Sequence, residues 1–152
     1  MKNKNCKGIT LLSLAITIVV LIILASISIN YGQDILEQSA LESVETNMLL
    51  IKAKVKVYAE EYNFSGDAGK LYGTKVSEST ESIVTEYNAS VGNIYANYYY
   101  LSANDLSNMG LAINNGNYLV NYDYNNIDIV YIEGITVNGT TYHTMSEIES
   151  IQ

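Results

Sequence analysis

Residues 7–29 read KGITLLSLAITIVVLIILASISI, and this stretch decides how the rest of the chain is arranged. After the glycine at position 8, no charged residue occurs until Asp34. At about 1.5 Å per residue, a helix over residues 9–29 is roughly 31 Å long, which matches the hydrocarbon core of a bilayer. The sequence therefore predicts a membrane-spanning helix near the start of the chain.

The charges on either side of this segment predict its orientation. Lys2, Lys4 and Lys7 precede it, whereas Asp34 and Glu37 follow it. The positive-inside rule places the N-terminus in the cytoplasm and the remaining residues outside the membrane. Beyond the first eight residues, five lysines stand against sixteen acids, a net side-chain charge of −11. Because so acidic a chain repels phosphate backbones, no nucleic-acid partner is expected.

The hexapeptide at residues 7–12, which leads directly into the apolar segment, resembles the prepilin signal of type IV pilins and type II secretion pseudopilins. The resemblance implies that a prepilin peptidase removes a leader of residues 1–8 by cutting between Gly8 and Ile9. It also implies N-methylation of Ile9 and retention of residues 9–30 as a transmembrane helix. The residues through which subunits would assemble begin with Thr10, Leu11, Leu12 and Ser13.

The same resemblance implies the partners and the location of the protein. The partners are other pilin or pseudopilin subunits, an assembly platform and a cytoplasmic ATPase. The location is the cytoplasmic membrane, crossed once, and then a cell-surface filament. The chain departs from the family pattern at Ser13, where a glutamate usually pairs with the N-terminal amine of a neighbouring subunit, and at Asn30, where proline is common. Clostridial-type variants of the signal often lack this glutamate too.

Residues 31–62 predict an amphipathic continuation of the helix. Apolar side chains recur here at alternating spacings of three and four, which places them on one helical face. These residues are Leu41, Val44, Met48, Ile51, Val55, Tyr58 and Tyr62. We expect the stripe to pack against the chain's own sheet, because about three heptads are short for the alternative, a coiled-coil dimer. Asn63, Ser65 and Gly66 predict the end of the helix.

Residues 63–152 predict a small extracytoplasmic α+β domain. The predicted elements are a short helix near residues 79–87 capped by Ser77 or Ser79, a strand at 94–101, a helix with a capping box of Ser102 and Asp105 that ends at Gly110, and strands at 118–122, 127–132, 135–137 and 140–144. Turns are predicted at 123–126, at Glu133-Gly134 and at Asn138-Gly139, the last a strong hairpin signal. The expected fold is pilin-like, a long N-terminal helix on a small antiparallel sheet.

Few residues of this chain suggest binding chemistry. Asp123, Asn125 and Asp128 lie close together in a predicted turn and offer oxygen atoms, which calcium prefers, although Asp and Asn are also ordinary turn residues. His143 is the only histidine and has no cysteine nearby in the sequence. No nucleophile motif, phosphate loop or zinc spacing is present, so neither an enzyme nor another cofactor is predicted.

Two functions therefore remain open at this point. The first is a structural subunit of a type IV pilus or of a pseudopilus like those of type II secretion. The alternative is a membrane-anchored extracellular binding module, or a minor tip subunit, that captures a ligand.

Overall fold

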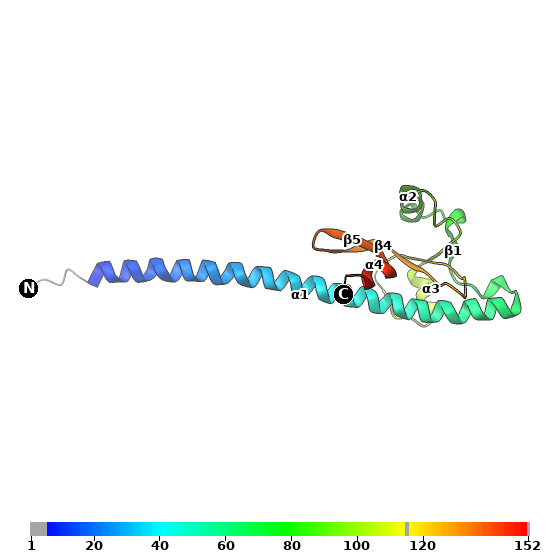
Figure 1. Cartoon of the computed structure of the whole chain (residues 1–152), viewed down its shortest axis with the longest axis horizontal. Coiled ribbons are helices and arrows are strands. Elements are labelled where there is room, and N and C mark those ends of the chain that lie inside the picture. Colours follow the sequence, from blue (N-terminus) through cyan, green and yellow to red (C-terminus); the bar gives the residue numbers. More distant parts are fainter. Residues whose placement is uncertain (1–5, 115, 152) are drawn as a thin grey trace, which may run out of the picture. The chain divides into compact units, whose positions relative to one another are not determined.

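A computed structural model describes the backbone of residues 6–114 and 116–151, and the side chains of these residues except 6–12 and 27–34. The chain divides into two compact units, Met1–Ser39 and Ala40–Gln152. The elements in chain order, labelled where there is room in Figure 1, are α1 (Cys6–Ser65), η1 (Ala68–Lys70), β1 (Thr74–Lys75), η2 (Val76–Glu78), α2 (Ser82–Ser90), β2 (Tyr99–Leu101), α3 (Ala103–Asn108), β3 (Tyr118–Val120), β4 (Ile129–Val137), β5 (Thr140–Thr144) and α4 (Met145–Glu149).

The first unit is formed by the N-terminal part of α1. The helix contains Gly32, which costs about 1 kcal/mol relative to alanine and does not interrupt it. Within the described residues, no helix combines the length and the apolar character that crossing a membrane requires. The predicted span at residues 9–29 includes residues 9–12 and 27–29, whose side chains lie outside the described part of the chain.

The second unit is an α+β domain in which the C-terminal part of α1 packs on a five-stranded antiparallel sheet. The strands follow one another in the order β1-β2-β3-β4-β5, so each pairs with its neighbour in sequence. Tyr100 lies opposite Leu119, Leu119 opposite Val130, and Val130 opposite Thr144. The α+β class and the antiparallel meander predicted from the sequence are confirmed.

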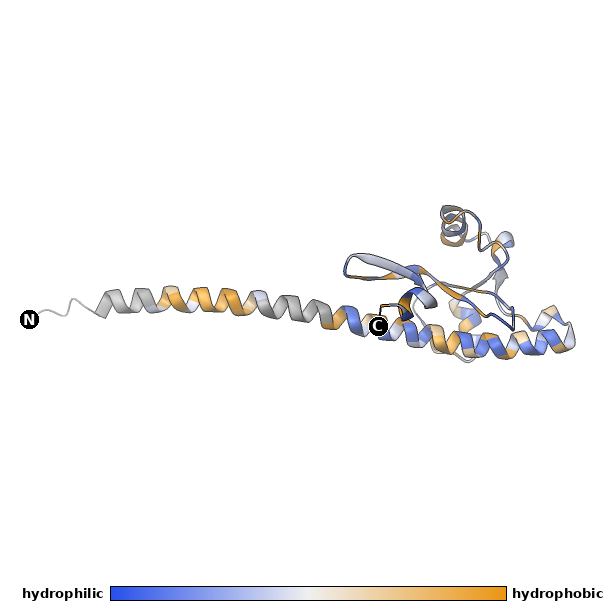
Figure 2. Cartoon of the chain, in the orientation of Figure 1, coloured by the Kyte–Doolittle hydropathy of each residue, from blue (hydrophilic) through white to orange (hydrophobic). Residues whose placement is uncertain are grey.

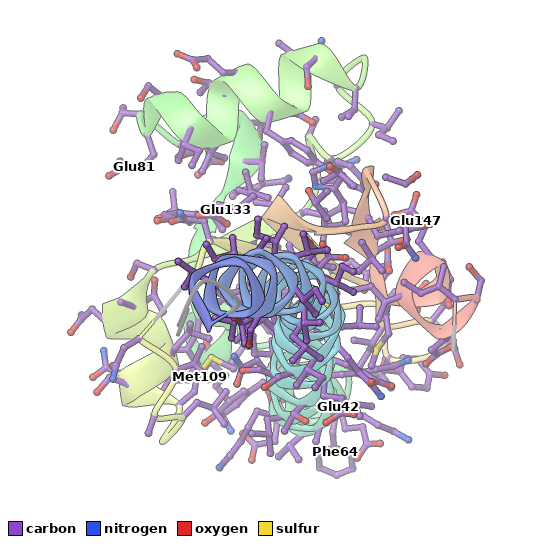
Figure 3. The ribbon with its side chains drawn as sticks, turned by 90° about the vertical axis from the view of Figure 1, so that its left-hand side faces the viewer. Glu42, Phe64, Glu81, Met109, Glu133 and Glu147 are labelled. Carbon is purple, nitrogen blue, oxygen red and sulfur yellow. The ribbon has the colours of Figure 1, made fainter. Side chains whose placement is uncertain are left out.

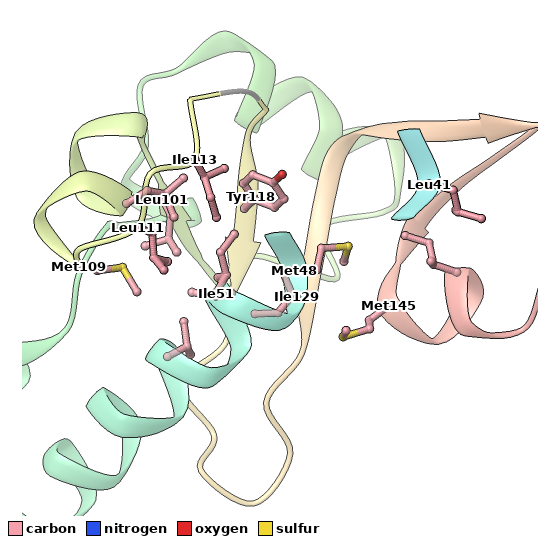
Figure 4. Packing of buried hydrophobic residues seen from close by; sticks show 14 residues of the cluster. Leu41, Met48, Ile51, Leu101, Met109, Leu111, Ile113, Tyr118, Ile129 and Met145 are labelled. Carbon is pink, nitrogen blue, oxygen red and sulfur yellow. The ribbon is translucent and has the colours of Figure 1, made fainter. Parts of the chain in front are cut away.

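The predicted stripe on α1 forms the centre of the domain core. Met48, Ile51 and Val55 are fully buried, and Ile51 packs in the same cluster as Leu101 and Ile129 of the sheet (Figure 4). Packing against the chain's own sheet is therefore confirmed over a coiled-coil dimer for this face. The prediction that the whole stripe packs on the sheet was wrong at its C-terminal end, where Tyr62 is 37% exposed.

The sheet buries both of its faces because its side chains alternate. Leu101 of β2 and Tyr118 of β3 belong to the cluster on the α1 side. Leu119 follows Tyr118 on β3, and Val130 follows the α1-side residue Ile129 on β4. Both belong to a second cluster that includes Val84 of α2. This alternation is the ordinary period of a strand, and it lets α1 and α2 cover opposite faces.

Several predicted strands have different bounds in the structure. The strand at 94–101 is reduced to Tyr99–Leu101, because Ala96 donates its backbone N–H to Asn93 and forms a turn. The strand at 118–122 ends at Val120. The strands at 127–132 and 135–137 form a single element, β4. The register of β4 shifts between Val130 and Ile135, so Gly134, at φ +70°, lies in a bulge where a turn was predicted.

Of the predictions made from local signals at helix ends and at the hairpin, two are confirmed and one was wrong. The capping box of Ser102 and Asp105 is present at the start of α3. Asn138 and Gly139 both have positive φ and connect β4 to β5, as predicted. The predicted cap of α2 was wrong, because Glu81 occupies the N-cap position and the Ser79 hydroxyl instead accepts the Glu81 N–H.

The C-terminal helix α4 was not predicted, although its start carries a second capping box. The Glu147 carboxylate accepts the backbone N–H groups of Thr144 and His143 at 2.9 and 2.8 Å. The Thr144 hydroxyl in turn accepts the Glu147 N–H. Met145 and Ile148 then bury their side chains, so the short helix is fixed to the domain at both its cap and its apolar face.

Replacing Glu147 with glutamine is expected to flatten the acid side of the stability–pH curve. The bonds from Thr144 and His143 lower the pKa of the Glu147 carboxyl from its usual value of 4.5. A carboxyl whose pKa is lower when folded contributes stability that is present above the unfolded pKa and lost as pH falls through the folded pKa. Thermal melts between neutral pH and about pH 3 measure this loss. Glu149→Gln, outside the capping box, is the matched control, and an acid limb that Glu147→Gln leaves unchanged would contradict the assignment.

Candidate functional site

The first unit presents an apolar helical segment whose side chains are exposed on every side. Nine large apolar residues are between 46% and 63% exposed, and they lie in the mostly orange stretch of the N-terminal helix in Figure 2. They are Leu14, Ile16, Ile18, Val19, Val20, Leu21, Ile22, Ile23 and Leu24. A helix that is apolar all round requires apolar surroundings, so this segment is a candidate for contact with lipid or with other helices.

The polar side chains inside this segment are satisfied by the helix itself. The Thr17 hydroxyl lies 2.7 Å from the Ser13 carbonyl oxygen and 3.0 Å from that of Leu14. The Ser26 hydroxyl donates to the Ile22 carbonyl at 2.8 Å. Serine and threonine commonly bond back to a preceding turn in this way, which removes the need for a partner outside the helix. The segment can therefore enter an apolar environment without leaving these donors unpaired.

The predicted processing residues lie at the beginning of α1. The helix begins at Cys6, so the backbone of Gly8 and Ile9 is helical, as is that of Thr10, Leu11 and Leu12. The side chains of residues 8–12 lie outside the described part of the chain. Ser13 is exposed, and its carbonyl accepts the Thr17 hydroxyl.

A second apolar stripe on α1 escaped the sequence analysis. It consists of Thr46, Leu50, Ala53, Val57 and Phe64, and we call it the outer stripe. Leu50 is 47% exposed, Val57 50% and Phe64 96%. Phe64 points away from the sheet (Figure 3). Its members are spaced four, three, four and seven residues apart, and this period is visible in the sequence. The stripe that contains Met48 and Ile51 has the same period and a larger apolar content, so its signal is the stronger of the two.

The three residues predicted to bind calcium are used in two separate sets of contacts. Asp123 Oδ1 accepts the backbone N–H of Asn125 at 3.1 Å, which closes the turn. Asp128 Oδ2 accepts the Tyr98 hydroxyl at 2.9 Å, and the Asp128 N–H donates to Asn121. Within the described residues, no group of three or more histidine, cysteine, aspartate or glutamate side chains is arranged to hold a metal ion.

Asp128 also lines a polar depression of about 340 Å³ between α1, the loop before β4, and α4. Lys52 contributes a cation to its wall, and Glu149 contributes a second carboxylate. Asp123 and Asn125 are not part of the lining. The depression can accept a small polar group, and the opposite charges in its wall give no net preference for a simple anion.

His143 takes part in an aromatic cluster that fixes α2 to the sheet. Its Nδ1 lies 2.9 Å from the Tyr131 carbonyl oxygen, and its ring lies 5.3 Å from that of Tyr87. Tyr87 stacks on Tyr95 at 5.9 Å, and Tyr95 meets the edge of Tyr98 at 4.9 Å. Burial, the Tyr95 hydroxyl and nearby carboxylates raise the pKa of Tyr87 to about 12, so these phenols are neutral hydrogen-bonding groups at physiological pH.

No family model, no curated protein and no solved structure matches this chain.

Proposed function

We propose that this chain is a structural subunit of a type IV pilus or of a pseudopilus like those of type II secretion. The observation that carries the proposal is the uncharged helical segment after Gly8, in which the described apolar side chains, from Leu14 to Leu24, are exposed on every side. Two further features support it: α1 runs from Cys6 to Ser65 as one helix, and its C-terminal part packs on an antiparallel sheet. The resemblance of residues 7–12 to the prepilin signal supplies the link to this family.

In this proposal the helix has two successive roles. Residues 9–30 hold the precursor in the cytoplasmic membrane while a prepilin peptidase cuts after Gly8 and methylates Ile9. The same apolar surface then leaves lipid for contact with other subunits, an exchange between two apolar environments that costs little. The assembly platform and a cytoplasmic ATPase drive the movement. The acidic domain faces the exterior, which agrees with its charge.

Ser13 gives this subunit a distinctive property. A carboxylate at this position would require a partner in lipid, and that requirement would fix the register between neighbouring helices. Serine supplies no charge, so we infer that either another group satisfies the N-terminal amine or the subunit takes a minor or tip position. Apolar packing along the helix would then carry more of the register.

The alternative proposal is a membrane-anchored binding module, and the polar depression beside Asp128 favours it. Lys52 and Glu149 could hold opposite ends of a small zwitterionic ligand there. A subunit that stays uncleaved and monomeric while binding such a ligand would favour this alternative over assembly.

Changing Gly8 to valine is expected to abolish processing. The peptidase must accommodate the backbone at this position, and a β-branched side chain fills the space that glycine leaves open. The full chain, expressed together with its cognate prepilin peptidase, should yield a methylated Ile9 at its N-terminus by mass spectrometry. The Gly8→Val variant should retain Met1 and the complete leader.

The matched control is Asn3→Val, the same new side chain elsewhere in the leader, which should be processed normally. An unprocessed wild-type chain, with Gly8→Val behaving identically, would remove the main support for a pilin-type subunit. It would leave the anchored binding module as the better proposal.

A further inference from the structure

The depression between α1, the loop before β4 and α4 carries charges of both signs that do not pair with one another. Lys52 lies on α1, Asp128 directly precedes β4, and Glu149 ends α4. In the part of the chain that the structure describes, Lys70 and Glu61 form an ion pair at 4.0 Å, whereas Lys52 forms none, although it shares the depression with two carboxylates. Lys52 and Asp128 are half-buried. The three charges of the depression are therefore available to a ligand.

Asp128 is held in a fixed position but keeps one oxygen atom for a ligand. Its Oδ2 accepts the Tyr98 hydroxyl at 2.9 Å, and its backbone N–H donates to Asn121 Oδ1 at 2.8 Å. The Asn121 amide also donates to the Asn126 carbonyl at 3.0 Å, so one side chain joins the two arms of the loop. Asp128 Oδ1 accepts no hydrogen bond from any described residue. Because the carboxylate is already ordered, binding to it costs little conformational entropy.

The depression also has an apolar part and enough room for a small molecule. Ile129 is fully buried and Met145 is 4% exposed, and both belong to its lining. Its volume of about 340 Å³ lies at the lower end of the range of about 300–1,000 Å³ that is typical of small-molecule sites. The depression therefore suits a small ligand whose charged ends are joined by an aliphatic stem.

The charges in the wall exclude the simplest ligands. A free anion would approach two carboxylates as well as one ammonium group. A calcium ion requires about six to eight oxygen ligands, and here it would meet two carboxylates and the opposing charge of Lys52. A neutral apolar molecule would take water away from three charges without replacing the hydrogen bonds of that water. A complementary ligand therefore carries charges of both signs.

The ratio of the charges narrows the class of ligand further. Two carboxylates and one ammonium group are balanced by a molecule that carries one carboxylate and two ammonium groups. An amino acid with an amine in its side chain, such as lysine, has this set of charges at neutral pH. Its aliphatic stem separates the side-chain ammonium from the other two groups. A zwitterion with only one ammonium group would leave one carboxylate of the wall without a partner.

We propose that this depression binds a basic α-amino acid, with the ligand carboxylate on Lys52 and the two ligand ammonium groups on Asp128 and Glu149. The proposal gives the class of ligand for the binding-module alternative and rests on that alternative, not on prepilin processing. All three residues belong to the second unit, so the site is present whether or not the leader is removed.

Isothermal titration calorimetry of the full chain in a neutral detergent tests the charges of the ligand one at a time. L-Lysine should bind about fivefold more tightly than 1,5-diaminopentane, which lacks only the carboxylate, and about fivefold more tightly than L-norleucine, which lacks only the side-chain ammonium. The factors are modest because water screens ion pairs between half-exposed groups. Equal affinities for the three compounds, or no heat of binding with L-lysine at millimolar concentration, would overturn the proposal.

Lys52→Met tests whether Lys52 holds the ligand carboxylate. The variant keeps an aliphatic side chain and should bind L-lysine and 1,5-diaminopentane equally, while it still prefers L-lysine to L-norleucine. That remaining preference also shows that the domain is folded. Lys54→Met, on the same helix but outside the depression, should keep both preferences. If Lys52→Met still prefers L-lysine to 1,5-diaminopentane about fivefold, the role given to Lys52 is wrong.

Replacing both carboxylates tests the other end of the ligand. Asp128→Asn combined with Glu149→Gln should bind L-lysine and L-norleucine alike, and a thermal melt of the same sample checks that the domain is folded. Asp123→Asn combined with Glu86→Gln removes the same two charges outside the lining and should keep the preference for L-lysine. A folded Asp128 and Glu149 double variant that keeps this preference would contradict the proposal.

The state of the N-terminus separates this inference from the pilin-type function. A sample whose Ile9 is methylated but which does not bind L-lysine would overturn the assigned ligand and leave the pilin-type function intact. A sample that retains Met1 and shows the expected preferences would support the assigned ligand and count against prepilin processing.

Discussion

The domain is expected to unfold when Ile51 is replaced by aspartate. Ile51 is fully buried between α1 and the sheet, in a cluster with Leu101, Tyr118 and Ile129. An aspartate there loses the apolar contacts and must either bury an unpaired carboxylate or take up a proton, at a cost of several kcal/mol. Small domains are stable by only about 5–15 kcal/mol, so this single change removes most or all of the stability. Circular dichroism melts of the full chain in detergent would show a lost or strongly lowered domain transition.

Leu50→Asp is the matched control, because it introduces the same charge one residue earlier on the same helix. Leu50 is 47% exposed and belongs to the outer stripe, so the change in unfolding free energy should stay within about 0.5 kcal/mol. Equal effects of the two substitutions would mean that the described orientation of α1 on the sheet is wrong. Together the two variants distinguish the face of α1 that stabilises the domain from the half-exposed face.

Replacing Gly73 with alanine is expected to destabilise the domain by about 3 kcal/mol or more. Gly73 has φ +92°, a conformation that L-residues with a side chain adopt at a cost of about 1–2 kcal/mol. A Cβ atom there would also lie 2.4 Å from the backbone carbonyl oxygen of Tyr100 and 3.0 Å from Leu101 Cδ2. The Tyr100 backbone belongs to β2 and cannot move without disturbing its pairing with β3. Chemical denaturation of the two proteins measures the difference.

Gly139→Ala separates the two contributions to this cost. Gly139 has a similar φ of +79°, but no atom lies within 4 Å of the position that its Cβ would occupy. It should therefore show the conformational cost alone, about 1–2 kcal/mol. A Gly73→Ala variant no less stable than Gly139→Ala would contradict the close approach of residue 73 to β2.

Local signals in the sequence predicted those parts of the fold that local chemistry controls. The capping box of Ser102 and Asp105 starts α3 because both partners lie within one turn of each other. Asn138 and Gly139 tolerate positive φ, so they can form the hairpin turn irrespective of how the flanking strands pack in the domain. The same capping pattern is present in the sequence at Thr144 and Glu147, where it starts α4, a helix beyond the last predicted strand at residues 140–144.

Other features depended on residues far apart in the chain. The separate strands predicted at 127–132 and 135–137 are one strand, because pairing with β5 continues past the bulge at Gly134. The strand β1 contains only Thr74 and Lys75, too short for any periodicity, and it exists through its pairing with Tyr99 and Tyr100. The contact between Asp128, one of the predicted calcium residues, and the Tyr98 hydroxyl likewise joins residues thirty positions apart, so no local pattern indicates it.

The sequence by itself determined the character of α1: an uncharged apolar segment after Gly8, then a helix with apolar residues at heptad spacing. Helical periodicity is a property of neighbouring residues, so no tertiary information is needed to find it. The buried face of α1 was also predicted, but only the tertiary structure decided how completely each apolar position of the helix is covered. Met48 and Leu50 differ little in hydrophobicity and stand two residues apart, and the sheet covers Met48 and leaves Leu50 half-exposed. The extent of coverage depends on the complementary shape of a surface built from five later strands and their loops, and spacing along one helix does not determine it.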